Sequence, residues 1–469
     1  MENKHVGIFG AGLVGTLLGL YLAKRGNKVD IFDRRADLRL TGVPPKTGRS
    51  INLALSMRGI EALKEIGAYH EVEKVAVSMQ GRMMHDPEGR LSFQPYGPNG
   101  ESIYSVSRTA LNETLMNMAD KDPRIKFHFN RRCLELDFNT TNATLLDTEK
   151  GGTDTYHADW IFGADGAFSS VRTSMVKTDR FDYSQTFIEH GYKEFTITPG
   201  DNGEWRMFKN ALHIWPRGHF MMIALPNPDG SFTCTLFFPF EGLPSFQSIE
   251  TRKDVEEFFL FYFRDLIKLI PDFVDQYFAS QPSSLVTISC FPWMRGNSMV
   301  IGDAAHAIVP FFGQGMNCGF EDVRILSQML DEGGSDWHTV LNEFQYVRKV
   351  DTDAIAQLAL DNFVEMRDKV ANPSFLLRKQ IEARLHRYAP EIWIPTYSMV
   401  TFNHMPYSEA QDRGAWQNAI LDEVMLDEEL NEILTLEDFE AIVWEKYVAP
   451  ALEDLDDIAE EMEVQRGRV

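Results

Sequence analysis

The chain has 469 residues, 44% of them hydrophobic and 12% aromatic, so it is long enough for two or three structural units and too apolar for a disordered protein. Its net charge of −23 argues against a nucleic-acid partner, which requires clustered lysine and arginine. The four cysteines lie far apart without a CxxC pair, which argues against disulfides and zinc and favours a reducing, cytoplasmic compartment. No apolar run approaches the roughly 20 residues that span a bilayer, so no membrane partner is expected.

Residues 5–33 have the pattern of a strand, a glycine turn, a helix and a second strand. The apolar run "HVGIF" precedes Gly10-x-Gly12-x-x-Gly15, and the second strand, "NKVDIFD", ends on Asp33. In such a unit the first glycine permits a tight turn, the second leaves room for a pyrophosphate, and the third allows close helix packing. The helix N-terminus favours phosphate charge, and the acid accepts hydrogen bonds from a ribose. We therefore expect a dinucleotide site here.

The next segment does not continue as a regular alternation of strands and helices, as a nicotinamide-binding domain would. A basic, turn-rich stretch is followed by a helix that begins near Ser56, and "SVSRTALNETLMNMA" predicts another helix, opening with Arg108. Strands are expected up to "GADGAFSSVR", which contains Asp165. Residues 181–290 alternate apolar and polar side chains, which predicts a β-sheet, with a helical pattern inserted at 254–270.

A second glycine-rich segment, "GDAAHAIVPFFGQGMN", lies at 302–317. Its pattern predicts a strand end at Asp303, a glycine turn, and a helix that begins near Met316. The chain beyond is helical in period. From Leu421 to Val469 it carries 17 acidic against 3 basic residues, which indicates amphipathic helices with solvated acidic faces, and a docking tail for a basic partner is the alternative.

The motifs GxGxxG, "GADGAFSSVR" and "GDAAHAIVPFFGQGMN", in this order, resemble the flavin-dependent aromatic hydroxylases of the para-hydroxybenzoate hydroxylase class. Shorter segments, among them "GRSINLALS", "HIWPR" and "YSMVTF", are similar to the kynurenine 3-monooxygenase family within that class. Eukaryotic members of the family carry a hydrophobic C-terminal anchor. This chain instead ends in "EDLDDIAEEMEVQRGRV" and looks like the soluble bacterial type.

The resemblance implies FAD as cofactor, held by a single Rossmann-type (GR2-like) unit, with NADPH as transient co-substrate and O2 as oxidant. It implies hydroxylation of L-kynurenine at C3 through a flavin C4a-hydroperoxide, in tryptophan catabolism. The cofactor carries this chemistry, so no catalytic side chain and no metal are expected. Ser107, His213 and Asp303 are not interpreted as a catalytic triad because no nucleophile-elbow motif accompanies them. His306 is given no proton-transfer role.

The resemblance points to a substrate site that consists of Arg82, Tyr96, Asn362, Tyr397 and Phe312. An arginine fork binds a carboxylate through two hydrogen bonds, and phenol and amide groups satisfy the remaining lone pairs. Taken alone, Arg82 fits a solvated surface arginine better, and the tyrosines fit packing positions. Further apolar contacts are expected from Phe311 and Phe312 and from the aromatic side chains at 237 and 238.

The expected FAD site combines both glycine-rich segments with positions that the resemblance implies. It consists of Gly10, Gly12, Leu13, Val14, Gly15, Asp33, Arg34, Arg35, Ala54, Arg108, Cys133, Asp165, Asp303, Gly315, Met316 and Asn317. The helix that begins near Met316 would stabilise the negative charge of reduced flavin. The two glycine-rich segments should therefore contact one ligand.

We expect an α/β fold with a discontinuous FAD-binding domain, an inserted substrate sheet and a helical C-terminal region. The expected boundaries are 1–180, with a small insertion near 70–100, then 181–290, 291–330 and 331–469. Three alternatives stay open: a hydroxylase of another anthranilate-like or phenolic acid, a flavin protein without monooxygenase activity, and an NAD-dependent dehydrogenase. The sequence leaves open a homodimer and the choice between NADPH and NADH.

Overall fold

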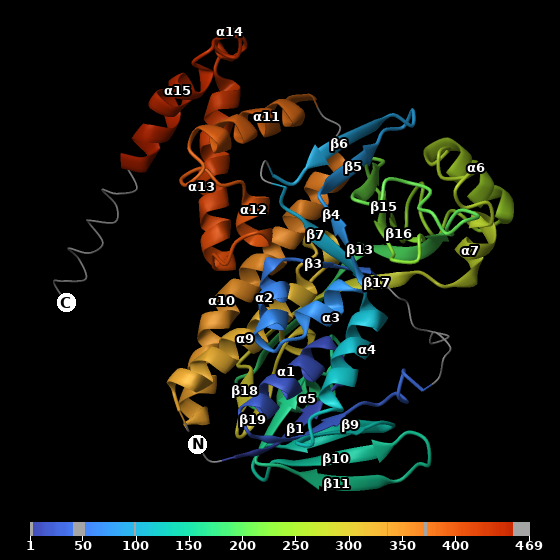
Figure 1. Cartoon of the computed structure of the whole chain (residues 1–469), viewed down its shortest axis with the longest axis vertical. Helices are drawn as coiled ribbons and strands as arrows, with labels where there is room; N and C mark the ends of the chain where they lie inside the picture. Colours follow the sequence, from blue (N-terminus) through green and yellow to red (C-terminus); the bar gives the residue numbers. More distant parts are fainter. Residues whose placement is uncertain (1–2, 41–51, 98–99, 335, 370–372, 454–469) are drawn as a thin grey trace. The chain divides into compact units, whose positions relative to one another are not determined.

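The computed structural model describes residues 3–40, 52–97, 100–334, 336–369 and 373–453. The chain forms two compact units, Met1–Asp368 and Lys369–Val469 (Figure 1). The long helix α10 (Trp337–Val364) packs against α9 (Gly315–Glu332) and belongs to the first unit. The expected C-terminal helical region, 331–469, included α10, because helical periodicity does not indicate which neighbours a helix packs against.

The first unit is built around a six-stranded sheet of order β18-β19-β12-β1-β2-β8, parallel except for β18. Its strands are β1 (His5–Phe9), β2 (Lys28–Phe32), β8 (Ile125–His128), β12 (Trp160–Gly163), β18 (Met294–Arg295) and β19 (Ser298–Val300). The central strands are almost entirely buried, as expected for a parallel sheet covered on both faces. The associated helices are α1 (Leu13–Lys24), α4 (Arg108–Ala119), α5 (Ser170–Val176), α8 (Asp303–His306) and α9.

Two small antiparallel sheets are formed by segments that lie between strands of this sheet in the sequence, one between β2 and β8 and one between β8 and β12. One has the order β3-β7-β4 and consists of β3 (Asn52–Leu55), β4 (Ala76–Met79) and β7 (Ile103–Ser107), with helices α2 (Met57–Glu65) and α3 (Tyr69–Glu73) between its strands. The other has the order β11-β10-β9 and consists of β9 (Arg131–Asp137), β10 (Asn142–Asp147) and β11 (Thr153–His157).

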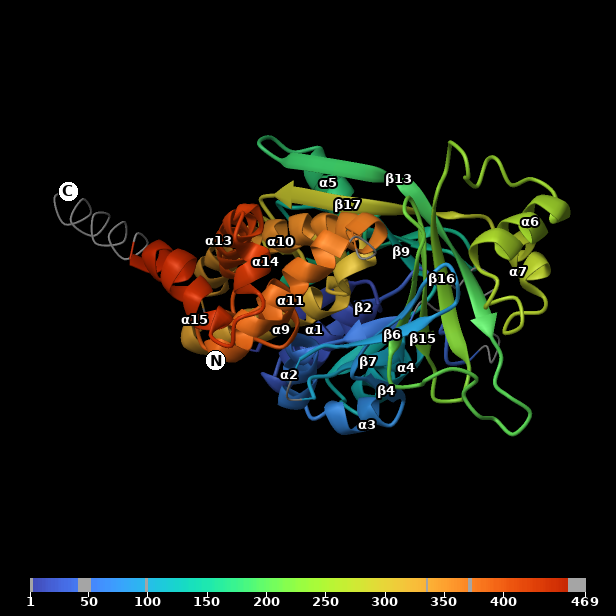
Figure 2. The same ribbon diagram turned by 90° about the horizontal axis from the view of Figure 1, so that it is seen from above.

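A larger, seven-stranded sheet has the order β17-β13-β16-β15-β14-β5-β6. It consists of β5 (Gly81–His85), β6 (Leu91–Pro95), β13 (Asp182–Ile197), β14 (Leu212–Pro216), β15 (Met221–Pro226), β16 (Phe232–Pro239) and β17 (Ser283–Phe291). The long strands β13 and β17 pair along most of their length (Figure 2). The expected insertion near 70–100 thus supplies two strands to this sheet, where β5 pairs in parallel with β14.

The two faces of the seven-stranded sheet have different neighbours because side chains alternate along each strand. Trp215, Met222 and Phe238 lie on the face that packs against α6 (Arg252–Tyr262) and α7 (Phe273–Ala279). The expectation that the side chain at 238 contacts the substrate is therefore wrong, since it is fully buried among Phe220, Phe246 and Phe258.

The opposite face of this sheet carries Arg82 and Phe237. The pairings Leu212↔Arg82, Pro216↔Met221 and Met221↔Phe237 connect the two residues through side chains on the same face. Strand register alone therefore puts an arginine and a phenylalanine, 155 positions apart in the sequence, on one surface.

Helix α6 ends at Tyr262, although the pattern predicted helix up to 270. A capping box of Thr251 and Asp254 fixes its start. Beyond its end, Leu266 and Ile270 turn into the core, and Asp265 accepts hydrogen bonds from two side chains of the sheet. These tertiary contacts outweigh the local helical pattern.

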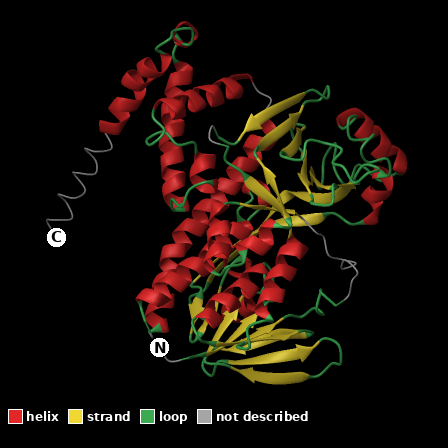
Figure 3. Cartoon of the chain, viewed as in Figure 1, coloured by secondary structure: helices red, strands yellow, loops and turns green. Residues whose placement is uncertain are grey.

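The described elements of the second unit are all helices (Figure 3). They are α11 (Pro373–Tyr388), α12 (Thr396–Thr401), α13 (Tyr407–Leu426), α14 (Leu430–Ile433), α15 (Phe439–Val443) and η3 (Trp444–Val448), and the π-helix η2 (Glu365–Lys369) precedes them at the boundary between the units. Their apolar side chains, such as Ile381, Trp393 and Leu421, form a core of their own. Within the described part of the chain, no helix combines the length and the apolar character needed to cross a membrane. The predicted α/β fold with an inserted sheet and a helical C-terminal region is confirmed.

Candidate flavin and substrate site

The glycines of the first turn differ in how much room a side chain would have at each position. Gly10 has φ +112°, and a Cβ there would lie 2.2 Å from the carbonyl oxygen of Ala164. A Cβ on Gly15 would lie 2.0 Å from the carbonyl oxygen of Gly10. A Cβ on Gly12 would have no neighbour within 4 Å among the described residues. Gly10 and Gly15 are therefore needed for packing, whereas Gly12 leaves open space at the N-terminus of α1, where an anion is favoured.

Asp33 follows β2 and holds the glycine turn. Its carboxylate accepts a hydrogen bond from the Ala11 N–H at 3.1 Å and from the Arg35 guanidinium through two contacts of 3.0 Å. Asp33 raises the pKa of Arg35 through this pair. Arg34 is exposed, and its carbonyl accepts from the Thr148 hydroxyl at 3.0 Å. A ribose at this strand end would thus meet an acid already oriented by an arginine.

Asp165 lies in the loop after β12, against the glycine turn. One carboxylate oxygen accepts from the Ser170 N–H at 2.7 Å, while Oδ1 is buried without a hydrogen-bond partner among the described residues. Burial raises the pKa of Asp165, and burial beside this carboxyl raises the pKa of the Cys133 thiol to about 12. Asn112 supplies a second buried oxygen without a hydrogen-bond partner among the described residues. Its Nδ2 donates to the Ala11 carbonyl at 3.1 Å, but its Oδ1 accepts from none of them. Buried acceptors without donors are rare.

These observations fit FAD. The open space at Gly12, the free N–H groups of a helix start and the two buried acceptors are what a dinucleotide with hydroxyls and a pyrophosphate requires. Asn112 was not identified from the sequence, because one asparagine within a helical pattern carries no signal. Arg108 is exposed at the first residue of α4, and Leu13 is buried in the core of the first unit.

The two glycine-rich segments are neighbours in space. Gly302, with φ +61°, precedes Asp303 at the start of α8, and a Cβ on Gly302 would lie 3.0 Å from Cγ2 of Val14. A Cβ on Gly319 in α9 would lie 2.6 Å from the same atom. Val14 therefore packs between the two segments, and its side chain is used for packing. That both segments contact one ligand stays a prediction.

The start of α9 is fixed by Asn317, whose side chain is fully buried. Its Oδ1 accepts from the Ser56 N–H at 2.9 Å, and its Nδ2 donates to the carbonyls of Ala54 and Gly313 at 2.8 Å each. The amide group is therefore committed to the protein. What the first turn offers to a ligand is backbone, namely the N–H groups of Gly315 and Met316 and of residue 317, which the helix leaves unpaired.

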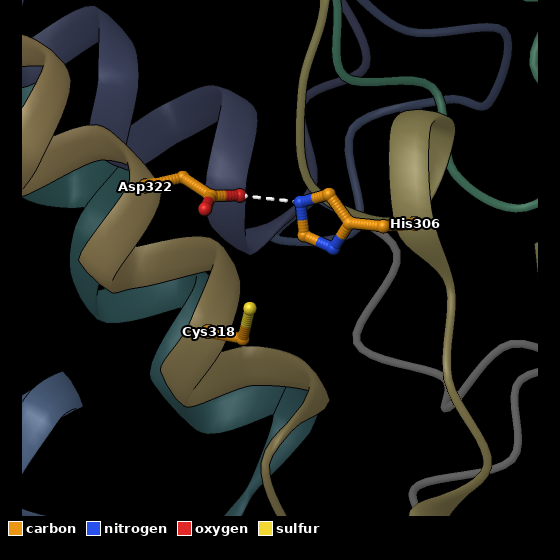
Figure 4. A group of neighbouring side chains, drawn as sticks. All are labelled: His306, Cys318 and Asp322. Carbon is orange, nitrogen blue, oxygen red and sulfur yellow. Dashed lines mark hydrogen bonds and ion pairs between the residues drawn. The ribbon is translucent and has the colours of Figure 1, made fainter. Parts of the chain in front are cut away.

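A buried ion-pair network lies behind this turn (Figure 4). His306 Nε2 lies 2.6 Å from Asp322, and Arg348 Nε donates to the other oxygen of that carboxylate at 2.9 Å. Arg348 also pairs with Glu321, which accepts from Arg58 at 2.6 Å. Burial disfavours a charged imidazole, but the neighbouring carboxylate outweighs it and raises the pKa of His306 to about 10. The network joins α2, α8, α9 and α10.

His306, Cys318 and Asp322 have ligand atoms within 4.8 Å of one another, which is close enough for a metal ion. The Arg348 guanidinium, however, contacts both Asp322 and, at 3.6 Å, the sulfur of Cys318. It supplies positive charge at the point where a metal ion would sit. We therefore interpret the group as an ion-pair network that fixes the helices.

The aromatic part of the expected substrate site is assembled by contacts. Phe311 stacks on Phe363 at 4.0 Å between ring centroids and meets the edge of Phe237 at 4.9 Å. Asn362 donates from Nδ2 to the Phe311 carbonyl at 2.7 Å, so it holds the loop η1 (Pro310–Phe312) in place. Phe312 is buried in the same loop. Phe363 was not predicted, and its only sequence signal is its position next to Asn362.

The polar part is formed by Arg82 and Tyr96, which share the β5–β6 region. The guanidinium lies over the Tyr96 ring at 6.0 Å, and both residues are half-buried. Tyr397 lies on α12, in the second unit, where its ring meets Phe402. The triad arrangement is not assembled: the Ser107 hydroxyl caps α4, and both ring nitrogens of His213 bond to other groups.

Comparison with known proteins agrees with this geometry. The sequence profile of the "FAD binding domain" family matches residues 3–230 and 264–337. The chain is 46% identical to the kynurenine 3-monooxygenase of Christiangramia forsetii over 425 residues, covering 90% of this chain and 94% of that protein. It is also 46% identical to that of Flavobacterium psychrophilum over 442 residues, covering 94% and 97%.

Among solved structures, 2-methyl-3-hydroxypyridine-5-carboxylic acid oxygenase superposes with a TM-score of 0.65 at 20% identity, covering 80% of this chain and 96% of that one. At this identity the likeness concerns the fold alone. The level and extent of identity with the two bacterial proteins decide the assignment: the chain belongs to the kynurenine 3-monooxygenase family, within the proteins built on the FAD binding domain.

Proposed function

We propose that the chain is an FAD-dependent monooxygenase that hydroxylates L-kynurenine at C3 to 3-hydroxykynurenine, with NADPH and O2 as co-substrates. The observation that carries the proposal is the common face of Arg82 and Phe237, with Phe237 in contact with the loop that precedes α9. A carboxylate-binding fork and an aromatic surface on one side of a sheet match an aromatic amino acid. The family relationship supports the same substrate.

When bound, FAD supplies the hydride-accepting and oxygen-activating chemistry that side chains lack. The residues that would hold it are the backbone around Gly12, the carboxylates of Asp33 and Asp165, and the first turn of α9. The N–H groups of that turn stabilise negative charge on a ligand without reorganisation. In this proposal the six-stranded sheet forms the FAD-binding domain and the seven-stranded sheet forms the substrate domain.

The substrate is held by Arg82, which binds its carboxylate through two hydrogen bonds, with Tyr96 as a further donor. Phe237 and Phe311 provide apolar contacts for the ring and keep water away from it, which favours hydroxylation over wasteful reduction of O2. The ring of an aniline is electron-rich, so no general base is required from the protein.

The deciding experiment is a product assay with kynurenine, NADPH and O2. The wild-type protein should form 3-hydroxykynurenine. Arg82→Ala should raise the KM for kynurenine roughly tenfold to hundredfold while retaining its flavin, since a charged double hydrogen bond is lost. Arg90→Ala, in the exposed turn of the same hairpin, is the matched control and should keep the wild-type KM.

Absence of product with kynurenine would refute the proposal. NADPH oxidation stimulated by another aromatic acid would instead assign a different substrate, and a flavin that never consumes O2 would exclude a monooxygenase. A parallel assay with NADH tests the choice of nucleotide. The cytoplasmic location belongs to the same proposal, and four buried free cysteines are compatible with it.

A further inference from the structure

Two histidines and an aspartate form a buried hydrogen-bonded chain on the seven-stranded sheet, away from the flavin loops. His85 Nδ1 lies 2.9 Å from the Asp265 carboxylate, and His85 Nε2 lies 2.8 Å from His213 Nδ1. His213 Nε2 lies 2.8 Å from the carbonyl oxygen of Phe208. Trp215 stacks on His85 at 3.9 Å and donates to Asp265 at 2.7 Å. We call His85, His213 and Asp265 the relay.

The partners fix where the protons are. A carbonyl oxygen only accepts, so His213 carries its proton on Nε2 and presents a lone pair on Nδ1. His85 must therefore donate from Nε2 to His213. An ionised carboxylate also only accepts, so His85 donates from Nδ1 to Asp265 as well. These contacts are satisfied in two ways: His85 carries both ring protons beside an ionised Asp265, or a protonated Asp265 donates to His85 Nδ1.

The titration behaviour of the neighbours favours the first of these arrangements. Burial lowers the pKa of His213 to about 4, so this ring is neutral. Burial opposes ionisation of Asp265, but hydrogen bonds from His85 and Trp215 outweigh it and hold the pKa of this carboxyl below its usual range. The relay therefore contains one imidazolium–carboxylate pair and one neutral imidazole.

The His85 side chain lies on the opposite face of β5 from Arg82. His85 and Arg82 are three positions apart on β5, so their side chains point to opposite faces. Strand β5 is attached to the rest of the sheet through a ladder of only three residue pairs with β14, and its other neighbour, β6, is an exposed edge strand. The His85 side chain adds a bond to β14 and another to the segment after α6.

We propose that the relay is a positioning device for the substrate: doubly protonated His85 holds β5 against β14 and so keeps Arg82 in place for the substrate carboxylate. This inference deepens the proposed function and rests on it. If the pair of His85 and Asp265 loses its shared proton, one of the relay's hydrogen bonds is lost, and β5 is held less firmly. The affinity for kynurenine should then fall.

Other charged groups near the relay come from two elements. Arg217, after β14, donates to the backbone carbonyls of His85 and Asp86. The turn between β5 and β6 carries Asp86 and Glu88, which pair with Arg90. They lie at the exposed end of β5, whereas His85 is 5% exposed.

The test uses the full-length flavoprotein and two near-isosteric variants, Asp265→Asn and His85→Gln. Each should weaken kynurenine binding, measured by perturbation of the flavin spectrum, about tenfold at neutral pH, as expected for the loss of one charged hydrogen bond. Flavin content and the maximal rate at saturating kynurenine should stay unchanged. His219→Gln, at an exposed histidine in the turn between β14 and β15, is the control and should behave as the wild type.

Two further measurements need no substrate. Ring-nitrogen chemical shifts, with His85→Gln for assignment, should show two protonated nitrogens on His85 at neutral pH. Amide hydrogen exchange of residues 81–85 should be faster in His85→Gln than in the wild type. A singly protonated His85, or wild-type kynurenine affinity in both variants, would overturn the inference. If the wild type fails to bind kynurenine, the proposed function fails, and the ring protonation and exchange rates still decide whether the relay exists.

Discussion

The open space at Gly12 gives a prediction that separates ligand binding from folding. A methyl group on Gly12 has no neighbour within 4 Å among the described residues, and the backbone there (φ −81°, ψ −174°) suits any residue. Gly12→Ala should therefore change the free energy of unfolding of the apoprotein by less than about 1 kcal/mol, because a gain of about 0.4–1 kcal/mol from a stiffer unfolded chain offsets the weaker helix cap. The same methyl group occupies the space that we assign to the FAD pyrophosphate.

The affinity of Gly12→Ala for FAD should fall roughly tenfold to hundredfold, the equivalent of about 1–3 kcal/mol for an overpacked contact. Gly15→Ala is the counterpart. Its Cβ would lie 2.0 Å from the backbone oxygen of Gly10, so the apoprotein itself should lose stability, by about 1–3 kcal/mol before any gain in helix propensity. Urea unfolding of the two apoproteins and fluorescence titration with FAD measure both quantities. Wild-type FAD affinity in Gly12→Ala would refute the assignment of this space.

Two further predictions concern the buried network and the faces of the sheet. The pKa of His306 is raised from 6.5 to about 10, so its pairing with Asp322 stabilises the fold fully below pH 6.5, and this stabilisation is lost as the pH rises to about 10. In His306→Gln, urea unfolding should show a smaller fall in the free energy of unfolding over this pH range. An unchanged fall would contradict the ion pair. Phe238→Ala should cost about 3–5 kcal/mol of stability in denaturant melts without changing the KM for kynurenine, whereas Phe237→Ala should raise that KM, and the reverse result would show that the faces are misassigned.

Local chain geometry explains why the sequence already predicted much of the cofactor site. The turn at Gly10, the packing of Gly15 and the acid at the end of β2 lie within one strand–turn–helix–strand unit, so their spacing along the chain sets their spacing in space. The same holds for the turn before α9. The role of Asn317 could not be derived this way, because its amide bonds to Ala54 and Ser56, more than 260 positions earlier.

The arrangement of the substrate site could not be predicted from the sequence, because it depends on tertiary structure. Phe237 and Phe238 are adjacent in the sequence, and only the strand register decides that the first meets Phe311 and the second is buried under α6. The relay joins β5, β14 and the segment after α6, which no local pattern connects. Sequence by itself determined the elements whose contacts are short along the chain, that is, the Rossmann unit, the glycine turns and the helical C-terminal region. Tertiary structure decided which faces and buried charges meet, because those contacts join segments whose proximity depends on strand register and helix packing.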